Sequence, residues 1–246
     1  MPLLMDDTMD ELKTASNYKF SAAKIDSLGA TEYTLATVVL DISGSVFSYK
    51  DALEQCIKTI YQSCKKSQRA ENLMFRLVVF NDFVKEVHGF KLLNTLSEND
   101  YSSILSPGGS TALFDAAKSA IEATNDYASI LYDQDFTSNA IIFVVTDGMD
   151  NASTETANSV KKVVKKSVND EKLESLTVVL VGVNDGDASV AGYLDSVKND
   201  TEITQFVDIG EATPNKLAKL ANFISRSISS TSQALGSGSA SQLLTF

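Results

Sequence analysis

The 246-residue sequence predicts a doubly wound α/β fold: a mostly parallel central sheet with one antiparallel edge strand and helices on both faces. Short segments that are apolar throughout, such as Leu35–Leu40 and Asn139–Thr146, are typical of strands buried on both faces of a parallel sheet. Amphipathic helical segments alternate with them. The link Asn81-Asp82 is too short for a crossover, so it predicts one antiparallel hairpin.

Six strands are expected in the core of this fold. They are Leu35–Leu40, Leu73–Phe80, Phe83–Phe90, Asn139–Thr146, Leu176–Val183 and Ile203–Ile209. Because the third of them follows the two-residue link, we expect it to form an edge of the sheet. His88 lies on this strand, and we expect it to be a surface or packing residue.

The predicted helices lie between these strands. They are Lys50–Lys66, Leu96–Leu105, Ala112–Leu131, Ser153–Val168, Ala188–Val197 and Asn215–Ser229. The first has apolar residues at the i, i+3, i+4 spacing of an amphipathic helix, and Pro214 precedes the last, where a missing N–H costs least. Four lysines between residues 161 and 166 are expected on a solvated face, which could also meet an acidic partner.

Segments of different composition flank the predicted domain, residues 34–230. Residues 1–33 form an N-terminal extension. We expect residues 1–16 to be a short helical or disordered lead, and residues 17–34 to be extended or a hairpin. Residues 231–246 form a Ser/Gly-rich tail, which is either flexible or a tether whose apolar end docks on this domain or a partner.

Composition and charge exclude several classes of protein. The net charge of -11 and pI of about 4.6 argue against nucleic acid or an anionic membrane as a partner, since both require a basic surface. The apolar segments are too short to span a bilayer, and the N-terminus shows no secretory signal. We expect one globular domain with a sizeable core.

The two cysteines, Cys56 and Cys64, lie in one predicted helix. A separation of eight residues places them about 12 Å apart along the helix axis, whereas a disulfide requires Cα atoms within about 7 Å. We therefore expect reduced core residues and a cytoplasmic protein.

The first core strand ends in a group of oxygen-bearing side chains. Asp41 directly follows the apolar segment, and Ser43 and Ser45 lie on the loop that leaves it. Alternate residues of an extended loop point the same way, and Gly44 allows the loop to turn tightly.

Two further segments supply oxygen at the same edge of the predicted sheet. Asp147 follows the strand Asn139–Thr146, and Thr111 follows a pair of glycines. Ligand sites of open α/β sheets lie beyond the carboxyl ends of the strands. We therefore expect Asp41 and Asp147 to meet there, with the hydroxyl of Thr111 close by.

Two carboxylates and three hydroxyls, without sulfur or imidazole, suit Mg²⁺, Mn²⁺ or Ca²⁺ better than zinc or copper. Two carboxylates match the charge of a dication. Because few protein oxygens bind directly, waters must complete the shell. One position is then open to an outside oxygen, such as an Asp or Glu of a partner.

This pattern resembles the metal-ion-dependent adhesion site (MIDAS) of von Willebrand factor A (vWA) domains. The resemblance covers about residues 34–230 and rests on Asp41-Ile42-Ser43-Gly44-Ser45, on Thr111 and on Thr146-Asp147-Gly148. It implies a Rossmann-like vWA fold and a Mg²⁺ or Mn²⁺ site at Asp41, Ser43, Ser45, Thr111 and Asp147. In the family a threonine more often follows the glycines directly, so either Ser110 or Thr111 could supply the hydroxyl; we favour Thr111.

The resemblance also implies a function. It predicts a non-enzymatic protein-interaction module of the intracellular bacterial or phage type, in which a partner's acidic side chain completes the metal shell. Partners found in this family include AAA+ ATPases of the MoxR type and stress or tellurite-resistance systems. No nucleic-acid or membrane partner is expected.

Two other functions compete with this one. A metal-dependent phosphatase could use Asp41 as its nucleophile, but Ser43 occupies the place where such enzymes carry a second Asp. GxSxG and phosphate-loop motifs are also absent from the sequence. A purely structural role in a larger assembly is the other alternative.

Three residues near the motif have less specific roles. Asp150 and Asn151 could accept hydrogen bonds in the outer shell of the metal, but we favour capping of the helix Ser153–Val168. Asp115 is expected in the first turn of its helix, where an acidic residue is favourable, and it could also contact a metal-bound water.

Overall fold

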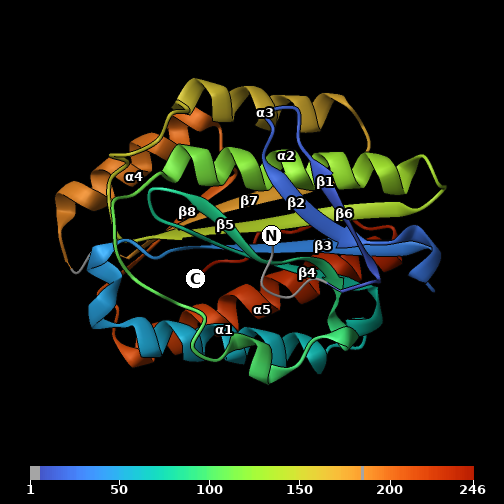
Figure 1. The fold of residues 1–246 in the computed structure, drawn as a ribbon, viewed down its shortest axis with the longest axis horizontal. Coiled ribbons are helices and arrows are strands. Elements are labelled where there is room, and N and C mark those ends of the chain that lie inside the picture. Colours follow the sequence, from blue (N-terminus) through green and yellow to red (C-terminus); the bar gives the residue numbers. More distant parts are fainter. Residues whose placement is uncertain (1–5, 184–185) are drawn as a thin grey trace.

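The computed structural model describes residues 6–183 and 186–246 and contains one sheet of eight strands (Figure 1). The strands are β1 (Met9–Lys13), β2 (Lys19–Ala23), β3 (Glu32–Asp41), β4 (Leu73–Phe80), β5 (Val84–Leu92), β6 (Thr137–Thr146), β7 (Leu176–Val183) and β8 (Gln205–Gly210). The helices are α1 (Lys50–Lys65), α2 (Leu113–Tyr132), α3 (Ala157–Asn169), α4 (Ala188–Thr201) and α5 (Pro214–Ser237).

The spatial order of the strands is β1-β2-β5-β4-β3-β6-β7-β8. Strands β4, β3, β6, β7 and β8 run parallel to one another, and β5 runs antiparallel to β4. Helices α2, α3 and α4 cover one face and α1 and α5 the other (Figure 1). The predicted doubly wound α/β fold is confirmed.

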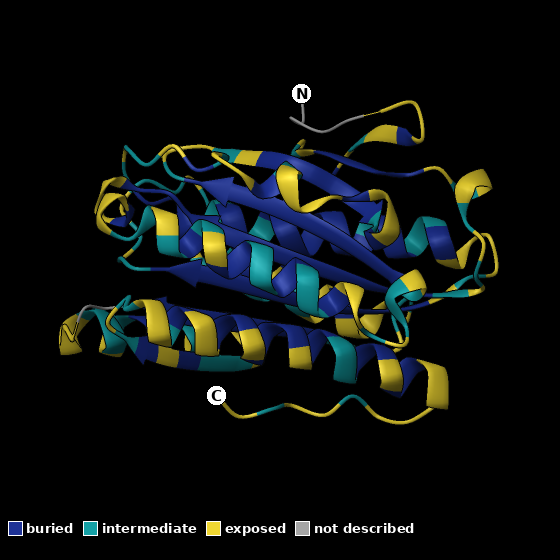
Figure 2. Ribbon diagram, turned by 90° about the horizontal axis from the view of Figure 1, so that it is seen from below, coloured by how far each residue is buried: buried dark blue, intermediate teal, exposed yellow. Residues whose placement is uncertain are grey.

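Strand β3 shows why the sheet has a core on both faces. Its side chains alternate: Val38 and Leu40 pack in the apolar cluster under α1 and α5, whereas Val39 packs in the cluster under α2. All three are almost fully buried, like most of the sheet in Figure 2. A strand that is apolar on both sides can lie only in the middle of such a three-layer structure.

Strand β5 is not at the edge of the sheet, so that prediction is wrong. The N-terminal extension forms the antiparallel hairpin β1–β2, and β2 lies against β5 at Ala22 and Phe90. Met9–Lys13 is therefore a strand and not a helical turn. Residues 1–5 of that expected lead lie outside the described residues. Burial of β5 also makes His88 a packing residue with no exposed surface.

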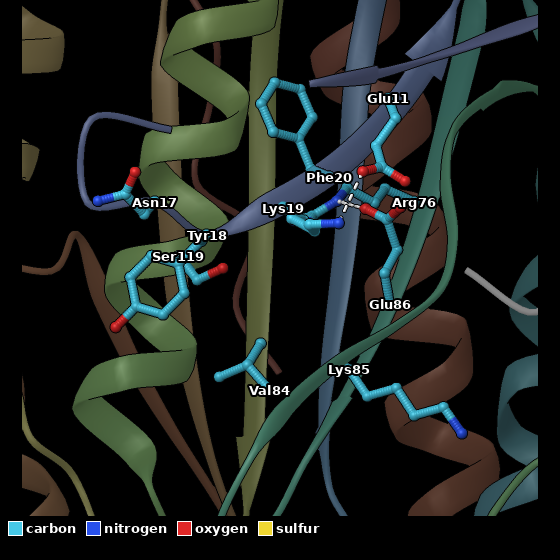
Figure 3. A pocket seen from close by; sticks show the side chains of 10 residues that line it. All are labelled: Glu11, Asn17, Tyr18, Lys19, Phe20, Arg76, Val84, Lys85, Glu86 and Ser119. Carbon is cyan, nitrogen blue, oxygen red and sulfur yellow. Dashed lines mark hydrogen bonds and ion pairs between the residues drawn. The ribbon is translucent and has the colours of Figure 1, made fainter. Parts of the chain in front are cut away.

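Buried polar contacts attach the hairpin to the sheet. Nε of Arg76 donates to Glu86 at 2.7 Å, and the other carboxylate oxygen of Glu86 accepts from both N–H and Oγ of Ser21. Figure 3 shows the pair Arg76 and Glu86 beside β2. At Gly89 an added Cβ would lie 1.8 Å from the carbonyl oxygen of Ser21, so only glycine permits this close approach.

Helix α5 continues beyond its predicted end at Ser229 and ends at Ser237, with Gly238 in the left-handed conformation as its cap. It continues because Thr231, Ser232, Ala234 and Leu235 are all buried on the domain. The remaining tail runs back along α5 (Figure 2).

The apolar end of the tail is docked on this domain. Leu244 packs against the core on the α1/α5 side, and its carbonyl accepts from Nε2 of Gln205. The ring of Phe246 meets that of Phe223 edge to face at 5.8 Å. This agrees with the docked alternative and not with a flexible tail.

Two predicted helices differ from the observed elements in length or starting residue. The segment Leu96–Leu105 forms a 3-10 turn at Glu98–Tyr101 and no longer helix. Helix α3 begins at Ala157, after the N-cap Thr156, and not at Ser153. Within the described parts of the chain, no helix is long and apolar enough to cross a membrane.

Candidate metal centre

Strand pairing places Asp41 beside the end of β6. Leu40 is in register with Val145, so the two strands reach the same edge together. Oγ1 of Thr146 donates to Oδ2 of Asp41 at 2.6 Å, and the N–H of Ser43 donates to Oδ1 at 2.7 Å. Each carboxylate oxygen of Asp41 therefore has one protein donor and keeps a lone pair for another partner.

A short chain of hydrogen bonds joins four of the five predicted ligands. Oγ of Ser43 and Oγ of Ser45 lie 3.1 Å apart, and Oγ of Ser45 donates to Oδ1 of Asp147 at 2.8 Å. The loop from Asp41 turns into a 3-10 helix at Gly44, which holds both hydroxyls at the corner. Residues from β3 and from the end of β6 therefore meet as the sequence predicts.

The glycine loop brings Thr111 to the same place. The N–H of Gly108 donates to the carbonyl of Ile42 at 2.8 Å, and the N–H of Gly44 donates to the carbonyl of Gly109 at 3.2 Å. Oγ1 of Thr111 lies 3.5 Å from the position that a Cβ on Gly148 would occupy, so this hydroxyl is beside the loop that carries Asp147.

The structure also separates Thr111 from Ser110. The N–H of Ser110 donates to Oδ2 of Asp82 on the β4–β5 turn. Thr111 is 4% exposed, and its N–H donates to Oδ1 of Asn151. Because Thr111 is buried beside the Asp147 loop and bonded to it, it is the better placed of the two hydroxyls.

Asp150 and Asn151 do not cap the helix that follows them, so that prediction is wrong. Oδ1 of Asp150 accepts from the N–H of Leu113 at 2.8 Å and from the hydroxyl of Ser153. Asp150 therefore caps α2, and Asn151 holds Thr111. Local sequence shows only the helix that follows, whereas the helix capped here lies earlier in the chain.

Asp115 lies in the first turn of α2, as predicted. One of its oxygens accepts from the N–H of Glu155 at 2.8 Å and the other from the N–H of Thr154 at 3.2 Å. These bonds fasten the loop before α3 to α2. They account for Asp115 as a residue that supports the loop, since both of its oxygens have backbone donors.

The electrostatics of the corner fit a cation. Asp41 is 2% exposed, and burial raises its pKa to about 6, with the charge of Asp147 acting in the same direction. Thr146 and Ser43 donate hydrogen bonds that partly oppose this rise. A buried carboxylate beside a second one is unfavourable unless a positive charge offsets them.

The chemistry of the donor set points to a hard cation. The five side chains offer oxygen alone, which suits Mg²⁺, Mn²⁺ or Ca²⁺. Among the described residues no three His, Cys, Asp or Glu side chains gather in a way that could hold a metal. A metal at this corner therefore depends on hydroxyls and water as well as on the two carboxylates.

Three exposed apolar side chains lie on loops at the edge of the sheet that holds the corner, a feature that the sequence analysis missed. Phe47, Phe83 and Met149 are 76%, 78% and 38% exposed. They lie on the loop after Ser45, on the β4–β5 turn and on the loop after Asp147. The only signal in the sequence is that an apolar residue stands close to each polar segment, and this does not predict exposure. We call these three residues the apolar rim.

Comparison with known proteins finds similarity in structure alone. No protein-family model matches the chain, and neither does any curated protein. Among solved structures, a D319A mutant of the PilB minor pilin from Streptococcus sanguinis superposes with a TM-score of 0.61 at 14% identity, over 89% of this chain and 66% of that one.

Two further neighbours come from other organisms. The pilus adhesin SpaC from Lactobacillus rhamnosus GG has a TM-score of 0.54 at 11% identity, over 86% of this chain and 31% of that one. Proximal thread matrix protein 1 from the mussel byssus, described with a zinc-occupied MIDAS motif, has a TM-score of 0.52 at 16% identity, over 81% and 46%. The chain thus spans less than two thirds of each neighbour's length.

These similarities establish a vWA-like fold. At such low identity they extend to the fold alone. The named neighbours are a pilin, an adhesin and a matrix protein, and one of them carries a divalent metal in its MIDAS motif.

Proposed function

We propose that the chain is a metal-dependent protein-interaction module. Asp41, Ser43, Ser45, Thr111 and Asp147 hold a Mg²⁺ or Mn²⁺ ion, with Ca²⁺ as the third candidate. An Asp or Glu side chain of a partner protein takes the remaining position. The observation that carries this proposal is the meeting of Asp41, Ser43, Ser45 and Asp147 through hydrogen bonds, with Thr111 beside them.

The five side chains would supply two kinds of ligand to the metal. Asp41 and Asp147 supply the negative charge, and the hydroxyls of Ser43, Ser45 and Thr111 supply neutral oxygens. The two carboxylates match the charge of a dication, but few protein oxygens bind the ion directly. One position is therefore left for an oxygen of an outside carboxylate. The apolar rim gives the partner surface to bury around that contact.

The proposal is for a binding protein and not an enzyme. His88 has no exposed surface and lies on β5, where its ring contacts Phe75 and Tyr101. Burial also raises the pKa of Cys56 and of Cys64 to about 12, which keeps both thiols protonated. Neither imidazole nor thiolate can therefore serve the corner as base or nucleophile.

The setting of this module is part of the proposal. Two buried free cysteines suit a reducing compartment, so we place the protein in the cytoplasm of a bacterium or its phage. There it acts as an adaptor in a larger complex, with a MoxR-type AAA+ ATPase or a stress or tellurite-resistance system as candidate partners. Two of the structural neighbours are described as a minor pilin and a pilus adhesin, so the fold also occurs in pilus proteins.

Calorimetric titration with Mg²⁺ and Mn²⁺ tests the metal site. We expect saturable binding to the wild type, none to Asp41→Ala, and unchanged binding to Asp195→Ala, an exposed acid on α4. Metal should also raise the melting temperature of the wild type and of Asp195→Ala only, since a ligand that binds the folded state stabilises it. Equal binding by all three proteins would disprove the site.

Affinity purification from the native cell, with Mg²⁺ and with a chelator, tests the partner. We expect one or more proteins to be retained with metal and lost with chelator, and also lost with Asp41→Ala. Retention that depends on neither metal nor Asp41 would exclude a metal-bridged partner.

A further inference from the structure

A second candidate site lies between the N-terminal hairpin and the sheet. A cavity of about 320 Å³ is lined by residues of β2, β4, β5 and α2, among them Phe20, Arg76, Val84 and Ser119 (Figure 3). Small-molecule sites start at about 300 Å³. None of the five predicted metal ligands lines this cavity, so it is separate from the metal centre.

The cavity exists because β2 and β5 diverge. The two strands are paired only at Ala22 and Phe90, next to the close contact between Ser21 and Gly89. No other residues of the two described strands are paired, and Lys19 of β2 and Val84 of β5 both line the cavity. A parallel pair held at one point leaves open space beside it unless side chains fill it, and here Phe20 and Val84 fill only part of it.

The hydrogen bonding of the Arg76–Glu86 pair is unequal. Glu86 accepts three bonds, from Arg76 and from the N–H and Oγ of Ser21. Arg76 is 1% exposed and its Nη1 has no hydrogen-bond partner among the described residues. A buried donor without an acceptor is unfavourable by about 1–3 kcal/mol. Nη1 itself has less than 1 Å² of accessible surface, so an acceptor oxygen that reaches it from the cavity after a small shift of the surrounding side chains would be favoured.

The charge and shape of the cavity limit which class of ligand could bind there. The charged residues of the lining are Glu11, Lys19, Arg76, Lys85 and Glu86, three positive and two negative, which is a net charge of +1 in a chain of net charge -11. Lys19 pairs with Glu11 at 2.9 Å and Arg76 with Glu86 at 2.7 Å, so the excess positive charge is that of Lys85. A single negative charge balances it, and a guanidinium matches the planar fork of a carboxylate. Phe20 and Val84 offer apolar contact next to it.

We propose that this cavity binds a small monocarboxylate with an apolar body. Its carboxylate accepts hydrogen bonds from the Arg76 guanidinium, and its apolar part lies between Phe20 and Val84. Tyr18 and Ser119 line the other side in Figure 3 and provide hydroxyls for a polar substituent. Because the ligand touches β2, β5 and α2 together, binding also fastens the N-terminal hairpin to the domain.

Nuclear magnetic resonance titration with benzoate, phenylacetate and acetate tests the proposal, with benzyl alcohol as the neutral counterpart of benzoate. We expect saturable shifts at Arg76 Nε, at Ser21 and at Val84, with a Kd of about 1 mM for benzoate, as suits a ligand of this size. Benzyl alcohol should bind at least tenfold more weakly. Acetate should bind more weakly than benzoate because it lacks the apolar body.

Two variants and a control keep the test specific. Ser119→Leu fills the cavity and should abolish the shifts, whereas Ser129→Leu, on the same helix but outside the cavity lining, should not. Arg76→Lys keeps the positive charge but loses the planar guanidinium, and should weaken benzoate binding about tenfold or more. Thermal melting shows whether each variant is folded.

The outcomes decide between clear alternatives. Absence of saturable shifts with all three carboxylates overturns the proposal, as does equal binding of benzyl alcohol and benzoate. Benzoate binding that survives Ser119→Leu in a folded protein places the ligand elsewhere and also overturns it. Asp41→Ala should bind benzoate like the wild type, so failure of the metal site leaves this result unchanged.

Discussion

At the scale of single residues, Asp41 shows how a strand end becomes a binding group. It has 2% exposure and two short hydrogen bonds, from Ser43 and Thr146, that set its orientation. Asp147, only partly buried, receives the hydroxyl of Ser45. One carboxylate is thus oriented by two hydrogen bonds and the other is partly exposed, as the proposed sharing of an ion with a partner would need.

His88 offers a prediction at this scale. Burial lowers its pKa to about 4 from the ordinary 6.5. Between these values the unfolded chain binds a proton that the folded protein does not, so the free energy of unfolding falls as the pH falls from 6.5 to 4. The full effect is about 3 kcal/mol.

Urea unfolding at pH 7.5, 6 and 5 measures this dependence. We expect His88→Gln, which cannot gain the proton, to lose less stability than the wild type over the same range. Because all other titrating groups are shared, the difference between the two proteins isolates the imidazole. Parallel stability curves for the two would show that folding does not lower the pKa of His88.

At the scale of elements, loops from distant parts of the chain hold one another. The start of α2 is capped by Asp150 from the loop after β6, and Asp115 of α2 in turn binds the backbone before α3. Asn151 holds Thr111 in the same way. The predicted metal ligands therefore rest on a network that ties β6, α2 and α3 together.

Replacement of Asp150 tests this network. Asp150→Ala should lower the free energy of unfolding by about 1–2 kcal/mol, as expected for loss of a helix cap, and should weaken Mg²⁺ binding because the Thr111 loop loosens. Asp150→Asn keeps an acceptor oxygen and should lose less stability and less Mg²⁺ affinity than Asp150→Ala. Calorimetry and urea unfolding report the two effects, and unchanged values for Asp150→Ala would show that the cap is dispensable.

The hairpin β1–β2 provides a second prediction at this scale. Gly89→Ala would place Cβ 1.8 Å from the carbonyl of Ser21, so β2 must move away from β5. We expect a loss of about 1–3 kcal/mol and faster amide hydrogen exchange in β1 and β2, with β3 and β6 unaffected.

Gly192→Ala is the matched control, because a Cβ at Gly192 meets no atom within 4 Å. Since this residue lies inside α4, alanine there should leave stability unchanged or raise it by up to about 1 kcal/mol. If exchange in the hairpin is the same in both variants, the close contact at Gly89 does not attach β2.

At the scale of the whole molecule, the carboxyl edge of the sheet concentrates the features of a binding surface. The polar corner and the apolar rim lie together there, on loops joined by the contacts of Gly44 with Gly109 and of Ser110 with Asp82. Phe47 and Phe83 are more exposed than any other large apolar residue in the described chain.

The rim predicts a selective loss of partner binding. Phe47→Ser and Phe83→Ser should each weaken the binding of a metal-dependent partner by about 1–3 kcal/mol, the range of moderate hot-spot residues. The melting temperature and the Mg²⁺ affinity should change little. Val168→Ser, at 70% exposure on α3, is the control. Surface plasmon resonance measures all three, and equal affinities would exclude the rim from the interface.

Much of this was accessible from the sequence because the signals are local. Uninterrupted apolar segments place β3, β6 and β7 inside the sheet, and the short turn after Phe80 makes β5 antiparallel. A strand that ends in Asp41 or Asp147 delivers that residue to the carboxyl edge, since parallel strands share one edge. The corner follows from these facts alone, and its five residues were predicted as the metal ligands.

The rest depends on contacts between residues far apart in the chain. The extension joins the sheet because Ser21 donates a hydrogen bond to Glu86 and its backbone packs closely against Gly89. Helix α5 continues past Ser229 because small side chains in its last turns are buried on the domain. Neither pattern is periodic enough to predict, since the burial that stabilises these segments comes from their neighbours. The cap from Asp150, the exposure of Phe47 and the cavity beside Arg76 likewise exist only once the chain is folded.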